Sequence, residues 1–144
     1  MTSVETNKSL VRRYIDEVQV AHRVEALDSI FAANFIDHAN TFDGVFQGID
    51  GLRQGYAELL SAFPDFSATL LDQVAEGDRV VTYKTVSGTH HGRFHGMEPT
   101  GRRFEIRVID IFRIRRGRIA ECWLLFDELG FYRQLGVIDT SSDN

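Results

Sequence analysis

The sequence is poor in the residues that cross-link or rigidify a fold. Its 144 residues include one cysteine, Cys122, and two prolines, so no disulfide can form within the chain. A single thiol is compatible with a reducing compartment, and we expect a cytoplasmic protein. The chain is long enough to bury a core, and its 43% of hydrophobic residues is ordinary for a globular domain.

Other features are absent as well. No apolar run approaches the length of a membrane-crossing helix, and the N-terminal residues lack the basic start and apolar stretch of a signal peptide. The net charge of -5 disfavours nucleic acid as a partner. We therefore expect no membrane or nucleic-acid partner, and one domain over 1–144 with a flexible tail at 137–144.

The histidines do not form a metal motif. His90 and His91 are adjacent, and neighbouring residues of a strand point to opposite faces, so at most one of them enters a given site. His38 lies far away in the sequence, and no third ligand follows at a recognisable spacing. We expect no bound metal.

The first half of the chain has the pattern of helices and the second half that of strands. Apolar residues recur at helical spacing through 10–18, 24–31 and 48–63. Runs rich in alternating or β-branched residues occupy 66–74, 79–90, 103–114 and 119–126. Helices followed by an antiparallel meander are typical of the α+β class.

One predicted strand carries an acid on its apolar face. Alternate residues of a strand lie on the same side, so Asp110 shares a face with Phe104, Ile106, Val108 and Phe112. An ionised carboxylate is unfavourable there unless it is paired, or unless its pKa rises and it becomes neutral. Asp110 is therefore a candidate functional residue, and the alternative is a structural carboxylate that a tyrosine or arginine satisfies.

The opposite face of the last two strands is apolar too. Ile109 and Ile111 lie on that face of one strand, and Trp123 and Leu125 on that face of the next. An antiparallel sheet with one solvated face alternates apolar with polar residues. We therefore predict that the helices cover one face and that a second copy of the chain covers the other, as a homodimer.

An ordered series of motifs resembles a known family. The motifs are Val11-Arg-Arg-Tyr14, Asn34-Phe-Ile-Asp-His38, Gly88-Thr-His-His-Gly92, Gly96-Met-Glu-Pro-Thr-Gly-Arg-Arg-Phe104, Ile109-Asp-Ile-Phe-Arg113, Gly117-Arg-Ile119 and Tyr132-Arg-Gln-Leu-Gly136. Together they are similar to the SnoaL-like polyketide cyclases of the nuclear-transport-factor-2-like superfamily. The resemblance implies a cone-shaped α+β barrel, in which N-terminal helices pack on a curved antiparallel sheet around a deep apolar pocket. It also implies cofactor-free acid/base chemistry on a small hydrophobic molecule, such as polyketide ring closure by an intramolecular aldol step.

Three residues are also similar to the catalytic set of ketosteroid isomerase, a relative on the same fold. The likeness matches Tyr14 to its helix-one tyrosine, Asp37 to its general base and Asp110 to its protonated aspartic acid. It implies that Asp37 moves a proton next to a carbonyl while Tyr14 and a neutral Asp110 donate to the enolate oxygen. The simpler explanations are a core tyrosine for Tyr14 and a turn-capping carboxylate for Asp37.

Leu124 departs from the family pattern. By spacing, it occupies the position of the cyclases' acid/base on the last strand, and a leucine transfers no proton. Proton transfer then falls to Asp37, Asp110 or a histidine. The residues that we expect to contact a ligand are Tyr56, His90, Val108, Phe112, Leu124 and Phe126.

Three nearby residues have structural explanations. We expect Cys122 to be a small apolar core residue without a base to activate it. Asp127, which follows the last strand, has the sequence context of a helix N-cap. Trp123 is expected at an interface or in the core and not under a substrate.

Three functions remain open at this point. The first is an enolate-forming enzyme that cyclises or isomerises a hydrophobic, carbonyl-bearing molecule of polyketide or steroid type. The second is epoxide opening by Asp37 and Asp110 with an activated water, although no inward arginine is evident to organise the second aspartate. The third is a non-catalytic binding or assembly module on the same fold, which Leu124 favours.

Overall fold

The structure, a computed structural model, describes residues 3–38 and 47–138. Its helical elements are α1 (Val4–Tyr14), the π-helical turn η1 (Ile15–Val20), the 3-10 turn η2 (Val24–Ala26), α2 (Leu27–Ile30), α3 (Gly48–Ala62) and α4 (Glu128–Leu135). Its strands are β1 (Phe31–Asp37), β2 (Ser67–Glu76), β3 (Arg79–Thr89), β4 (Arg103–Arg115) and β5 (Arg118–Phe126). None of the helices in these two stretches is long and apolar enough to cross a membrane.

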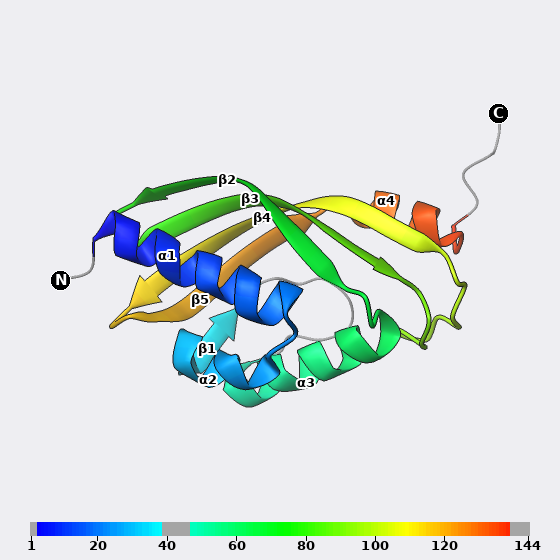
Figure 1. The fold of residues 1–144 in the computed structure, drawn as a ribbon, viewed down its shortest axis with the longest axis horizontal. Helices are drawn as coiled ribbons and strands as arrows, with labels where there is room; N and C mark the ends of the chain where they lie inside the picture. Colours follow the sequence, from blue (N-terminus) through cyan, green and yellow to red (C-terminus); the bar gives the residue numbers. More distant parts are fainter. Residues whose placement is uncertain (1–2, 39–46, 139–144) are drawn as a thin grey trace.

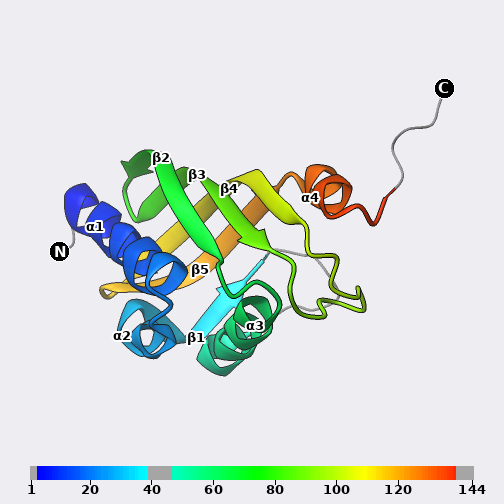
Figure 2. The ribbon, with the colours of Figure 1, turned by 45° about the vertical axis from the view of Figure 1, so that its right-hand side comes forward.

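The strands form one curved sheet in the order β1-β5-β4-β3-β2. The sheet arches over α1, α2 and α3, while α4 lies at its far end (Figures 1 and 2). The α+β class with N-terminal helices on a curved sheet is thus confirmed. Two details differ from the expectation. β1 pairs with β5 in parallel, and the sheet is open, with β1 and β2 at its edges and helices completing the enclosure.

The predicted helices are confirmed at the first and third positions. Ser3 caps α1, because its hydroxyl accepts the Thr6 backbone N–H at 3.0 Å. The second helix is shorter than the pattern predicts. Phe31 is extended (φ -104°, ψ 150°) and begins β1, where it pairs with Ile119 of β5. Sheet pairing therefore ends α2 after a single turn.

The alternating residues of β4 lie on a buried inner face and an outer face, as predicted. Its inner face is buried from Phe104 to Phe112, with Asp110 only 1% exposed. On the outer face, Ile109 and Leu125 are 48% and 78% exposed. In Figure 1, the helices α1, α2 and α3 lie on the concave side of the sheet. The homodimer across this face stays a prediction.

The end of the chain lies partly outside the described residues. Of the tail expected to be flexible, 139–144 lie outside them. Val137 follows Gly136, the C-cap of α4, and its backbone N–H donates to the Tyr132 carbonyl at 3.1 Å. Asp127 caps α4 as predicted, because its carboxylate accepts the Gly130 backbone N–H at 2.9 Å.

Candidate functional site

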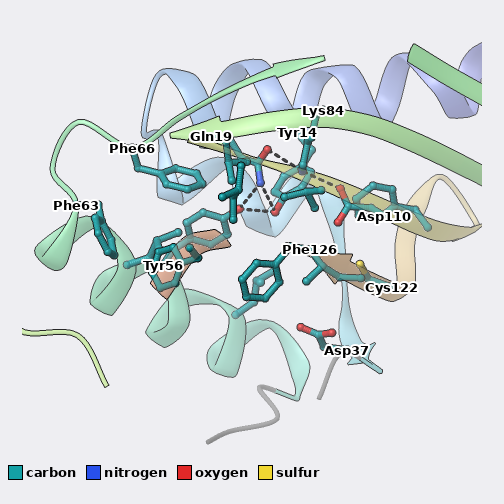
Figure 3. A pocket seen from close by; sticks show the side chains of 18 of the residues that line it. Tyr14, Gln19, Asp37, Tyr56, Phe63, Phe66, Lys84, Asp110, Cys122 and Phe126 are labelled. Atoms are coloured by element: carbon teal, nitrogen blue, oxygen red, sulfur yellow. Dashed lines mark hydrogen bonds and ion pairs between the residues drawn. The ribbon is translucent and has the colours of Figure 1, made fainter. Parts of the chain in front are cut away.

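A cavity of about 230 Å³ lies between the inner face of the sheet and the helices α1 and α3 (Figure 3). Phenylalanine and aliphatic side chains make up most of its wall. The polar side chains on the wall are Tyr14, Gln19, Asp37, Tyr56, Lys84 and Asp110. An apolar cavity with a few convergent polar groups is the usual form of a small-molecule site.

Most of the site residues expected from the sequence meet in this cavity. The expected residues on its wall are Tyr14, Asp37, Tyr56, Val108, Asp110, Phe112, Leu124 and Phe126. His90 does not join them, and Gln19 and Lys84 were not expected. The side chain of Leu124 on the wall means that the cyclases' acid/base position, as inferred from spacing, is apolar here.

Asp110 forms a buried ion pair. One of its carboxylate oxygens, Oδ2, accepts from the Thr82 hydroxyl at 2.9 Å and lies 2.8 Å from the Lys84 ammonium. Thr82 sits directly opposite Asp110 in the neighbouring strand β3. An ammonium group can only donate, so this pairing favours the carboxylate form of Asp110. The neutral, hydrogen-bond-donating form that the likeness to ketosteroid isomerase implies does not fit these contacts.

Lys84 extends the network toward the helices. Its side chain is 2% exposed, and its Nζ donates to the Gln19 side-chain oxygen at 3.0 Å as well as pairing with Asp110. It also lies 5.7 Å from the centroid of the Tyr14 ring, within cation–π range. The sequence signal for Lys84 was a charged residue at an inward position of an apolar strand, the same signal that identified Asp110.

A pair of tyrosine hydroxyls ends the network. Tyr14 from α1 and Tyr56 from α3 hydrogen-bond to each other, and the Gln19 amide nitrogen donates to both, at 3.2 and 3.0 Å. Burial raises the pKa of both phenols, and the neighbouring Tyr56 raises that of Tyr14 further. Both tyrosines are therefore neutral hydroxyls at physiological pH.

The π-helical turn explains how Gln19 reaches Tyr14. The two residues are five positions apart in the chain, and in a regular α-helix their side chains would point about 140° apart. In η1 the backbone is wound more loosely, and this brings positions five apart onto one face. The spacing of apolar residues contains no sign of this change of winding, so Gln19 was missed.

Asp37 is a second carboxylate of the cavity. It ends β1 and pairs in parallel register with Cys122 of β5. The turn that it would cap in the simpler explanation lies at 39–40, outside the described residues. Figure 3 shows its carboxylate on the side of the cavity away from the tyrosine hydroxyls. The site thus presents a carboxylate on one wall and a hydroxyl pair on another.

His90 was expected to contact a ligand, and the structure places it elsewhere. Its ring is completely buried behind Phe63, which it stacks against with centroids 5.3 Å apart, and it does not line the cavity. Its Nδ1 accepts the Thr100 backbone N–H at 3.3 Å, which requires a ring without a proton on that nitrogen. Burial lowers the pKa of His90. Its role is to hold the loop that follows β3.

Cys122 and Trp123 occupy opposite faces of β5. Burial raises the pKa of the Cys122 thiol well above its ordinary value, and the carboxylates of Asp110 and Asp37 raise it further. The thiol is therefore protonated and weakly nucleophilic, as predicted. Trp123 lies on the outer face, stacked on His38 with centroids 4.6 Å apart. Among the described residues, no three histidine, cysteine or acidic side chains gather in the way that a metal site needs.

Comparisons with known proteins agree with the fold and the motifs. The model of the SnoaL-like polyketide cyclase family matches residues 9–135. The chain is 28% identical to the nogalonic acid methyl ester cyclase of Streptomyces nogalater over 115 residues, 79% of this chain and 86% of that protein.

Two solved structures are similar over nearly the whole chain. TsrD from Streptomyces laurentii is 30% identical, with a TM-score of 0.85 over 96% of this chain and all of that one. IdmH, a putative polyketide cyclase from Streptomyces antibioticus, is 29% identical, with a TM-score of 0.78 over 90% of this chain and 98% of that one. With a family match that spans most of its length, the chain belongs to the SnoaL-like polyketide cyclase family.

Proposed function

We propose that this protein is an acid/base enzyme that forms the enolate of a hydrophobic carbonyl compound and thereby cyclises or isomerises it. The observation that carries the proposal is that one apolar cavity holds both the Asp37 carboxylate and, on another wall, the neutral hydroxyl pair of Tyr14 and Tyr56. A base and a hydrogen-bond donor are the two groups that proton removal next to a carbonyl requires.

The proposed reaction begins with the carbonyl oxygen at the tyrosine pair. Asp37 removes a proton from the adjacent carbon, the C–H electrons form the enolate double bond, and the oxygen gains negative charge that the hydroxyl pair stabilises. In cyclisation, the enolate carbon attacks a second carbonyl of the same molecule and a new C–C bond forms. The π electrons of that carbonyl move to its oxygen, which takes the proton back from Asp37 and becomes a hydroxyl group. In isomerisation, Asp37 returns the proton to a carbon further along the conjugated chain.

Asp110 has a different role here from the one that the likeness to ketosteroid isomerase implies. Because it is paired with Lys84 and Thr82, it supports the network behind the donors, and Tyr56 takes the place of the second donor. A cyclisation is also consistent with the relative from Streptomyces nogalater, which is named as a cyclase. Leu124 rules out proton transfer by the last strand at that position, so the proposal assigns the base to Asp37 alone.

The isomerisation of a β,γ-unsaturated cyclic ketone tests this proposal. Asp37→Asn should lower the rate by about 10²- to 10⁴-fold, the usual contribution of a general base. Asp16→Asn, the same change at an exposed helical carboxylate, should leave the rate unchanged. Equal rates in the wild type and D37N at the buffer background would refute the isomerase form of the proposal.

Epoxide opening is a second candidate, because Lys84 supplies a cation beside Asp110. In that reaction Asp37 takes a proton from water and the water oxygen attacks an epoxide carbon. The bond from that carbon to the ring oxygen breaks, and the ring oxygen takes a proton from the Lys84 ammonium. Epoxide opening would be supported if the wild type releases a diol from an aryl epoxide and if this activity is lost in Asp37→Asn and also in Asp110→Asn. Ligand binding without turnover of either substrate class would support the non-catalytic module.

A further inference from the structure

The side-chain amide of Gln19 joins the ion pair to the tyrosine pair, and its orientation is fixed. The Lys84 ammonium has hydrogens to donate and no acceptor, so the atom of Gln19 that faces it at 3.0 Å must be the carbonyl oxygen. The amide nitrogen then faces the hydroxyls of Tyr14 and Tyr56, at 3.2 and 3.0 Å. Asp110 holds Lys84 in place from the other side at 2.8 Å.

The amide orientation determines where the hydroxyl protons of the tyrosine pair go. Both hydroxyl oxygens accept a hydrogen from Gln19, so neither hydroxyl can donate back to it. The two hydroxyls carry one proton each, and their mutual hydrogen bond uses one of them. The second proton has no acceptor among the described side chains that form this network. It remains to be donated to whatever occupies the cavity.

We propose that Gln19, held by Lys84, is a positioning residue that makes the tyrosine pair a hydrogen-bond donor, and that the site thereby selects a neutral ketone oxygen over a hydroxyl group. The selection has a physical cause. A ketone oxygen only accepts, whereas an alcohol of the same shape also brings a proton for which this wall offers no acceptor. A buried donor without an acceptor loses the hydrogen bond that it made in water.

Charge and size narrow the ligand class further. Lys84 and Asp110 neutralise each other at the polar end, so that end offers no net charge to an anionic group. Asp37, a carboxylate in the same cavity, disfavours an anion as well. A cavity of about 230 Å³ is below the usual range for drug-sized ligands, roughly 300 to 1,000 Å³. The geometry therefore fits a neutral, mostly aromatic ketone of about two fused rings.

This inference deepens the proposed function, but its test needs no turnover. The probes are 1-tetralone and its alcohol, 1-tetralol, which share two fused rings and differ in one oxygen group. Ligand-observed NMR would give the dissociation constant of each for the wild type. We expect the ketone to bind about tenfold more tightly, the difference that one lost hydrogen bond produces.

Gln19→Glu reverses the direction of the network at nearly constant shape. Its two carboxylate oxygens accept from Lys84 and from the tyrosine pair. One hydroxyl proton stays in the Tyr14–Tyr56 hydrogen bond and the other is donated to residue 19, so no proton is left for the ligand and the pair can only accept from it. The preference should then pass to the alcohol. A side chain that served only to fill space would lower the affinity for both probes together and leave their ratio unchanged.

Two further variants keep the test decisive. Gln54→Glu, the same change at an exposed position on α3, should keep the wild-type ratio. If Q19E does not fold, Gln19→Met removes the amide without adding charge. In that variant the ratio of the dissociation constants of 1-tetralol and 1-tetralone should fall to about one.

The outcomes separate this inference from the enzymatic proposal. The inference would be overturned if the wild type binds neither probe, or binds both with equal affinity. It would also be overturned if the ratio of the two dissociation constants in Q19E or Q19M equals that of the wild type. If no ketone is turned over but the ratio reverses in Q19E, the enolate chemistry is refuted and the inference about Gln19 stands.

Discussion

The Lys84 ammonium lies 2.8 Å from the Asp110 carboxylate in an otherwise largely aromatic cavity, and both side chains are 2% exposed. Buried charges of this kind persist only when each has its partner. The pair connects through Gln19 to the tyrosine hydroxyls. Stability and the proposed chemistry therefore depend on the same chain of contacts, and this has consequences that can be measured.

Removing one member of the ion pair should destabilise the fold strongly. Lys84→Met leaves the Asp110 carboxylate buried without its cation, and we expect a loss of about 3 to 5 kcal/mol in the free energy of unfolding. The double variant K84M/D110N, which leaves no buried charge, should recover much of that loss. Lys8→Met, at a surface ion pair, should change stability by less than about 1 kcal/mol. Urea denaturation measures all three, and a K84M variant as stable as K8M would contradict the ion pair.

The buried tyrosines should make the protein sensitive to alkali. Their pKa is raised in the folded state, so above pH about 10 the unfolded chain loses phenolic protons that the folded chain keeps. This part of the stability is fully present below pH 10 and is lost as the pH rises further. Tyr56→Phe should flatten the fall between pH 9.5 and 11, and Tyr83→Phe, on the outer face, should not. Equal slopes in the wild type and Y56F would refute the raised pKa.

The buried ring of His90 should produce a loss of stability in acid. Because its pKa is lowered, the folded state binds fewer protons than the unfolded chain below pH about 6.5. Its contribution is therefore present above that pH and is lost as the pH falls. His90→Gln should be less stable at neutral pH and should lose less stability between pH 7 and 5. His95→Asn, at an exposed histidine, is the control and should lose as much stability per pH unit as the wild type. The same loss in H90Q would contradict the assignment to His90.

The outer face of the sheet should join two copies of the chain. Leu125 and Ile109 are exposed there beside Trp123, and apolar patches of this kind often mark interfaces. Leu125→Asp places a charge at the centre of the face and should yield a folded monomer, because the side chain contributes little to the core. Analytical ultracentrifugation of the wild type and L125D tests this, with circular dichroism to confirm the fold. A monomeric wild type would refute the homodimer.

The strands β2 to β5 could be predicted from alternation and β-branched content, and β1 was not among the predicted strands. Asp110 was placed correctly on the buried face because a strand has a strict period of two. The same rule applied to β3 would have identified Lys84, whose neighbours on the inner face are Thr82 and Val86. The resemblance supplied Tyr14 and Asp37, because their neighbouring residues match those of a relative.

Other features depend on contacts that no local pattern contains. The parallel pairing of β1 with β5 joins segments more than 80 residues apart, and the loose winding of η1 that brings Gln19 beside Tyr14 has no periodic signal. The position of His90 in the family resemblance suggested a ligand contact. Its ring instead lies behind Phe63 because the chain leaves the sheet after Thr89. The ion pair of Asp110 with Lys84 could not be inferred from β4 alone, because the partner lies on another strand.

The most direct test of the enolate proposal is the exchange of the protons next to the carbonyl of 1-tetralone in D₂O, followed by NMR. This exchange detects the enolate itself, whichever product the natural substrate gives. We expect exchange above the buffer rate in the wild type and in D16N, a loss of about 10²- to 10⁴-fold in Asp37→Asn, and about 10²- to 10³-fold in Tyr14→Phe or Tyr56→Phe. Exchange at the buffer rate in the wild type, or an undiminished rate in D37N, would contradict the assignment of Asp37 as the base that forms an enolate in this cavity.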